Sequence, residues 1–100
     1  MFNKLFLLLF FVGISSAFAQ ETIQLKGKII ADSIQGSSIN IVNLSNFSGT
    51  TNASDGSFEI KASVNDTLFF SSVQFKKKQV IVSPEIFGKG FLEIQLEENI

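Results

Sequence analysis

The stretch Asp55–Ser71, DGSFEIKASVNDTLFFS, contains two turn signals on either side of a short segment in which apolar and polar residues alternate. Every second residue of SFEIKA (residues 57–62) is apolar, and successive side chains of a β-strand point to opposite faces. Asp-Gly before this segment and Asn-Asp after it are typical turn residues. The stretch therefore predicts a turn, a strand with one buried face, a second turn, and a further strand that begins near LFFS.

The same period of two recurs along the rest of the chain. QVIV (Gln79–Val82) is almost continuously apolar, as expected for a strand that is covered on both faces. SPEIFG predicts one helical turn with Ser83 as its cap and Pro84 at its first position, ending at Gly88. Short strands between regular turns predict an all-β protein, an antiparallel β-sandwich. The other alternating segments are TIQLKGKII (22–30), INIVN (39–43), LFFS (68–71) and FLEIQLE (91–97).

The first 19 residues have the composition of a secretory signal peptide. One lysine precedes the ten-residue apolar run Leu5–Ile14, and Ala17 and Ala19 provide the small residues of a cleavage site before Gln20. The apolar run is well short of the roughly 20 residues that a membrane-spanning helix needs. We therefore predict a signal peptide over residues 1–19, one domain over residues 20–100, and no membrane span after processing.

The composition of residues 20–100 excludes several classes of function. Seven lysines and nine acidic residues give a net charge of −2, and the chain has no arginine, so no nucleic-acid partner is expected. Histidine and cysteine are also absent from the sequence, which removes the usual general base, the usual zinc ligands and the thiol nucleophile. We therefore expect no catalytic residues, no metal site and no cofactor.

Asp55-Gly56 deserves a test as a calcium site because acidic residues and glycine occur together in calcium-binding loops. If Gly56 is the sixth residue of an EF-hand loop, Ala53 is the third and Ala62 the twelfth, and neither side chain offers an oxygen ligand. A hairpin turn, in which glycine supplies a positive φ, fits the two residues better.

Two features are candidate partner contacts. Leu68 and Phe70 share one face of their strand and are assigned to the core, so Phe69 between them is expected to face outward. Lys76, Lys77 and Lys78 form the only run of like charge. This run fits either a contact with an anionic surface or the protection of an exposed strand edge against unwanted pairing.

The order and spacing of the motifs resemble those of a known domain family. The motifs are LKGKI (25–29), INI (39–41), GTTN (49–52), DGSFEI (55–60) and DTLFFS (66–71), followed by Phe75. They resemble the carboxypeptidase regulatory-like (peptidase-associated) domain of Bacteroidota exported proteins over nearly all of residues 20–100. The resemblance implies a Greek-key, transthyretin-like (prealbumin-like) β-sandwich of about seven strands.

The resemblance also implies a role. Such domains are non-catalytic accessory modules, so the chain is expected to support interaction or structure in the cell envelope, with a protein or a glycan as its partner. The alternative is the N-terminal periplasmic domain of a larger TonB-dependent transporter or peptidase. The signal-peptide pattern predicts an exported protein, and together with the resemblance it predicts a location in the periplasm, at the outer membrane, or outside the cell.

Overall fold

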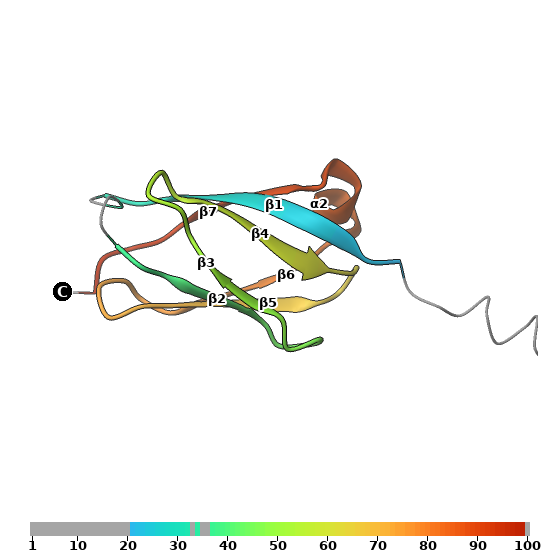
Figure 1. Ribbon diagram of the computed structural model, residues 1–100, viewed down its shortest axis with the longest axis horizontal. Helices are drawn as coiled ribbons and strands as arrows, with labels where there is room; N and C mark the ends of the chain where they lie inside the picture. Colours follow the sequence, from blue (N-terminus) through green and yellow to red (C-terminus); the bar gives the residue numbers. More distant parts are fainter. Residues whose placement is uncertain (1–20, 33, 35–36, 100) are drawn as a thin grey trace, which may run out of the picture.

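The computed structural model of the chain describes residues 21–32, 34 and 37–99. The predicted signal peptide and its cleavage site at Ala17, Ala19 and Gln20 lie outside these residues. The described part of the chain forms seven strands and one short helix (Figure 1). The elements are β1 (Ile23–Ile30), β2 (Asn40–Asn43), β3 (Gly49–Thr51), β4 (Ser57–Ala62), β5 (Thr67–Ser71), β6 (Lys78–Ile81), α2 (Pro84–Lys89) and β7 (Phe91–Gln95).

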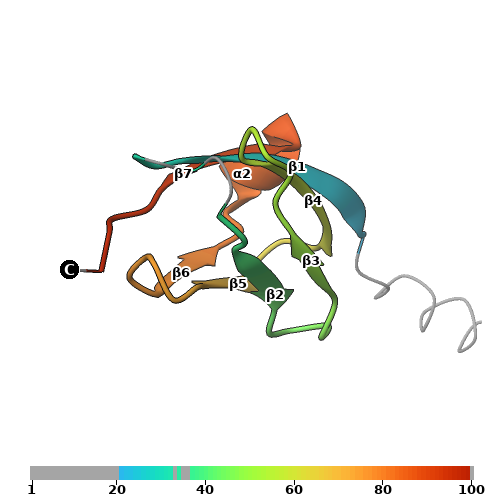
Figure 2. The ribbon, with the colours of Figure 1, turned by 60° about the vertical axis from the view of Figure 1, so that its left-hand side comes forward.

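The strands form two sheets that lie one above the other (Figure 2). One has three strands in the order β4-β1-β7, and the other has four in the order β3-β2-β5-β6. Four of the five strand pairs are antiparallel, as the sequence predicts, but β1 and β7 are parallel. The chain enters the three-stranded sheet from α2 beside the first half of β1, where the Lys26 N–H donates to the Gly90 carbonyl. From there β7 runs along the second half of β1 in the same direction, from Phe91 beside Lys26 to Gln95 beside Ile30.

The core between the sheets is built from the apolar positions of the alternating segments, which confirms the predicted inward faces. Leu68 and Phe70 are fully buried, and the Phe70 ring meets the Phe58 ring of the opposite sheet edge to face, with centroids 5.7 Å apart. Edge-to-face contact suits the charge distribution of aromatic rings. The other core residues are Leu25, Ile29, Ile39, Ile41, Ile60, Ala62, Phe75, Val82, Leu92, Ile94 and Leu96.

The prediction for QVIV is wrong. β6 is an edge strand that pairs with β5 alone within the described chain, and Ile81 is 61% exposed. Val80 is half-buried, and only Val82, beyond the end of the strand, is fully buried. A continuous apolar run therefore marks here an edge strand with one apolar side chain on its outer face.

The predicted helical turn begins as expected and ends later. Ser83 caps the helix by accepting a hydrogen bond at its Oγ from the Ile86 N–H (3.1 Å), and Pro84 occupies the first position. The helix ends at Lys89 rather than at Gly88. Gly90 takes the left-handed conformation (φ 68°), and its N–H donates to two helix carbonyls at 2.9 and 3.1 Å.

Candidate functional site

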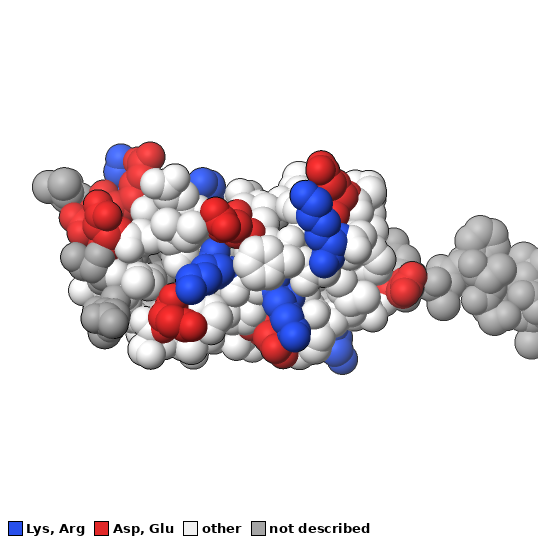
Figure 3. Space-filling view, turned by 90° about the horizontal axis from the view of Figure 1, so that it is seen from above, with Lys and Arg blue, Asp and Glu red and all other residues white. Residues whose placement is uncertain are grey.

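The outer face of the three-stranded sheet is covered with charges of both signs. Figure 3 shows acidic and basic side chains interspersed across this face of the molecule. In the strand register Lys26 lies opposite Glu59, and Lys28 lies opposite Glu93. Opposite charges in cross-strand positions favour pairing within the sheet. The charged positions on this face are Lys26, Lys28, Glu59, Lys61 and Glu93.

The outer face of the four-stranded sheet is different in kind. On β2 and β5, the residues of this face are those that alternate with the buried residues. On β3 and β6, they are the register partners of these outward residues. None of them is charged. We call this surface the uncharged face. It consists of Asn40, Val42, Gly49, Thr51, Thr67, Phe69, Ser71, Gln79 and Ile81.

Phe69 lies at the centre of the uncharged face. It is half-buried, whereas Leu68 and Phe70 on either side are fully buried, so the predicted outward orientation is confirmed. Its register neighbours are Val42 on β2 and Gln79 on β6. The centre of the face is therefore apolar, and its surroundings carry amide and hydroxyl groups.

The three lysines do not form one site with Phe69. The Lys76 ammonium lies 3.5 Å from Glu97 Oε2, and the Lys78 ammonium donates to the Gln95 carbonyl (3.1 Å), so both reach toward the end of β7. Lys77 between them is exposed. Lys78 is the first residue of β6, the edge strand, and Lys76 and Lys77 directly precede it. Lysine at such an edge hinders pairing with a further strand. Contact with an anionic partner stays a prediction.

Asp55 and Gly56 form a turn, as predicted. Gly56 has a φ of 91°, and Asp55 Oδ1 accepts hydrogen bonds from the Ser57 hydroxyl (2.6 Å) and the Ser57 N–H (3.0 Å). These bonds lower the pKa of the Asp55 carboxyl below its ordinary value of 3.8. The expectation of a hairpin is wrong, because the turn joins β3 of one sheet to β4 of the other. The Gly56 carbonyl also accepts a hydrogen bond from the Ile29 N–H (2.8 Å), which fixes the turn to β1.

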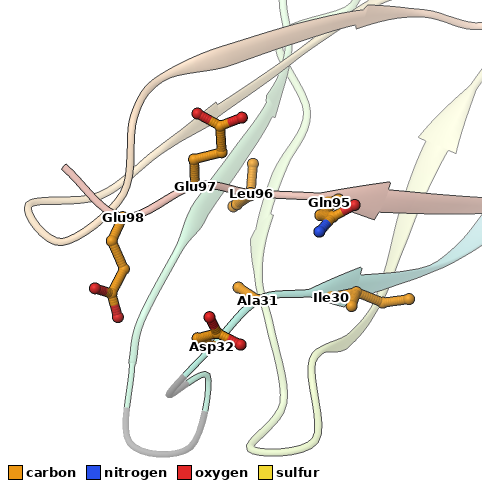
Figure 4. A pocket seen from close by; sticks show the side chains of 7 residues that line it. All are labelled: Ile30, Ala31, Asp32, Gln95, Leu96, Glu97 and Glu98. Carbon is orange, nitrogen blue, oxygen red and sulfur yellow. The ribbon is translucent and has the colours of Figure 1, made fainter.

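A hollow of about 360 Å³ lies where β1 and β7 end (Figure 4). Three carboxylates border it, those of Asp32, Glu97 and Glu98, and they point in different directions. Glu97 is paired with Lys76. Throughout the described ranges, no three His, Cys, Asp or Glu side chains are grouped so that they could hold a metal ion. The hollow therefore offers no converging set of ligands.

A buried polar cluster that was not predicted from the sequence lies at the end of β2. Asn43 is fully buried, and its amide donates to Asp66 Oδ2 (2.8 Å) and to the Lys61 carbonyl (3.0 Å). The side-chain oxygen Oδ1 of Asn43 accepts hydrogen bonds from the backbone N–H groups of Ser45 and Asn46. The alternation of INIVN, which places residue 43 on the inner side with residues 39 and 41, was the available signal. The cluster is structural, because all its polar groups are satisfied within the fold.

Phe47 is the most unusual exposed residue outside the uncharged face. It lies in the connection between β2 and β3, is 84% exposed, and has a φ of 61°. A bulky residue rarely adopts this left-handed conformation. The loop is held by a hydrogen bond from the Phe47 N–H to the backbone carbonyl of Asn43 (2.8 Å). No pattern in the sequence distinguishes Phe47 from the phenylalanines of the core.

Comparisons with known proteins leave the geometry as the basis for assigning a function. No protein-family model matches the chain, and no curated protein matches it in sequence. Within the described residues, no helix has both the length and the apolar character needed to cross a membrane.

Proposed function

We propose that this chain is an exported, non-catalytic β-sandwich module that holds a partner on the uncharged face in the cell envelope. The observation that carries the proposal is the contrast between the two outer faces. Five charged side chains lie on the outer face of the three-stranded sheet, whereas none of the outward-facing strand residues of the four-stranded sheet is charged. Lys78, the one charged strand residue of that sheet, is in register with the buried Phe70 and not with the outward residues.

The contrast matters because binding removes water from both surfaces. Burying an unpaired charge costs much more free energy than burying an amide or a hydroxyl group that regains a hydrogen bond. Binding surfaces are accordingly depleted of charge at their centre and enriched in aromatic residues. Phe69 with its neutral surroundings has this composition, whereas the charged face would lose the hydration of several ions.

The finer fold assignment is part of the same proposal. We assign the module to the Greek-key, transthyretin-like sandwiches because of the two-sheet arrangement and the motif order from LKGKI to Phe75. The lack of histidine and cysteine in the sequence supports a non-catalytic role.

The signal-peptide pattern of residues 1–19 supports export. Intact-mass measurement of the protein from the periplasm or medium tests this part, and a species that begins at Gln20 is expected. A mature species that retains residues 1–19 would contradict export by cleavage.

Photo-crosslinking tests the surface. A benzophenone amino acid, which reacts with C–H bonds of proteins and glycans alike, replaces Gln79 on the uncharged face or Lys28 on the charged face. After illumination of intact cells, we expect an adduct of higher mass from position 79 and none from position 28. Adducts from position 28 alone, or from neither position, would refute the proposed surface.

A further inference from the structure

We propose that the ligand of the uncharged face is a short stretch of a neutral polysaccharide, an inference that rests on the proposed function. Three properties of the face favour this class of ligand over a protein: its size, its apolar centre and the chemistry of its free polar groups.

The face is small. Four strands spaced about 4.8 Å apart, each contributing a few residues at about 3.3 Å, give a flat area of about 300 Å². A standard protein–protein interface uses about 20–30 residues on each side, whereas the uncharged face has nine. A protein partner would have to cover the charged surroundings as well, including the lysines that precede β6. A short oligosaccharide fits within the face itself.

The centre of the face offers a platform for sugar rings. The half-exposed ring of Phe69 lies beside Val42, and Ile81 follows two residues after Gln79 on the neighbouring strand. The faces of a pyranose ring present C–H groups, which carry small positive charges, and the face of an aromatic ring is negative. A sugar ring placed over Phe69 therefore gains both apolar burial and electrostatic attraction.

The polar groups around this platform match sugar hydroxyls. Asn40 and Gln79 are exposed, and within the described chain their side-chain amides form no hydrogen bond to other protein groups. Each amide offers both donors and an acceptor, as a hydroxyl-rich ligand requires. The hydroxyls of Thr51, Thr67 and Ser71 add to this set. No lysine lies among the strand residues of the face to pair with a carboxylate or sulfate, so an uncharged sugar chain fits better than an anionic one.

Affinity electrophoresis of the processed chain tests the inference. The gels contain hydroxyethylcellulose, galactomannan, laminarin or soluble starch as neutral polymers, and carboxymethylcellulose as the anionic counterpart of the first. We expect at least one neutral polymer to retard the protein and carboxymethylcellulose to leave it unretarded. Phe69→Ala should weaken the retardation at least tenfold, and Gln79→Ala, which leaves the apolar centre intact, should weaken it severalfold.

Phe91→Ala is the matched control, because Phe91 is an exposed aromatic residue (46%) on the outer face of the other sheet. This variant should bind as the wild type does. Absence of retardation by every neutral polymer, or equal retardation of Phe69→Ala and wild type, would overturn the glycan assignment. If the adduct from position 79 then proves to be a protein, the interaction surface stands and only its ligand class is wrong.

Discussion

Replacing Gly27 with alanine should destabilise the fold strongly, although the change adds a single methyl group. Gly27 faces the core from β1, directly opposite Phe58 on β4. A Cβ at this position would lie 2.7 Å from Phe58 Cε2 and still closer to Cζ and Cε1, a separation that real Cβ atoms essentially never show. The ring cannot move without disturbing its edge-to-face contact with Phe70.

The expected cost follows from three contributions. Overpacking a well-filled core costs typically 1–3 kcal/mol. Displacing the ring also weakens an aromatic contact that is worth about 0.5–1.5 kcal/mol. Alanine gains back about 0.5–1 kcal/mol because glycine loses more conformational freedom on folding. The net loss is about 2 kcal/mol, out of a total of about 4–12 kcal/mol for a domain of this length.

Urea denaturation measures the loss as a lower midpoint with an unchanged slope. Gly49→Ala is the control, because a Cβ there would make only ordinary contacts, 3.6 Å to the Ile41 carbonyl oxygen and 4.0 Å to Val42 Cγ2. Adding Phe58→Leu to Gly27→Ala should recover at least about 1 kcal/mol relative to the sum of the two single effects, because neighbouring sites couple. A Gly27→Ala protein as stable as the wild type, or strictly additive variants, would refute this packing.

Three further predictions concern stability and charge. Phe70→Ala should cost roughly 3–5 kcal/mol because its side chain is fully buried, whereas Phe69→Ala should cost about 1 kcal/mol or less; chemical denaturation compares them, and a reversed order would invert the assigned faces. Asn43→Ala should cost about 1–3 kcal/mol by leaving a buried carboxylate short of a donor, and thermal unfolding that matches the wild type would contradict this. The pKa of Asp55 should lie below 3.8 because its carboxylate accepts hydrogen bonds from Ser57. The stabilisation that these hydrogen bonds provide is therefore fully present above the unfolded-state pKa, and it is lost as the pH falls through the folded-state pKa. Carboxyl chemical shifts followed against pH measure this, and an ordinary or raised value would contradict it.

Local patterns predicted most of the strands and their inner faces. Strict alternation in SFEIKA and FLEIQLE leaves only one register that buries the apolar residues, so burial follows directly from sequence. The same patterns say nothing of which strand lies beside which. The parallel pairing of β1 with β7 depends on where α2 delivers the chain, and the exposure of β6 depends on its place at the edge of a sheet. Neither is a property of the segment itself.

The candidate surface was predictable only in part. Phe69 could be assigned outward because it stands between two inward residues. The neutral face around it brings together two pairs of consecutive strands, β2 with β3 and β5 with β6, from separate parts of the chain, so its lack of charge becomes visible only when the strand order is known. The interior position of Asn43 had a signal in the alternation of INIVN, but its partner Asp66 depends on tertiary contact.

Backbone amide chemical shifts of the isotope-labelled chain, recorded before and after addition of envelope extract from the producing cells, test the assigned binding surface most directly. If the uncharged face binds the partner, the largest chemical-shift changes should cluster at Val42, Phe69, Gln79 and their strand neighbours. The amide chemical shifts of Lys28, Glu59 and Glu93 on the other sheet should not change. Phe69→Ala should reduce these changes while the spectrum of the free protein remains that of a folded domain. Changes centred on the three-stranded sheet, or none at all, would contradict the assignment.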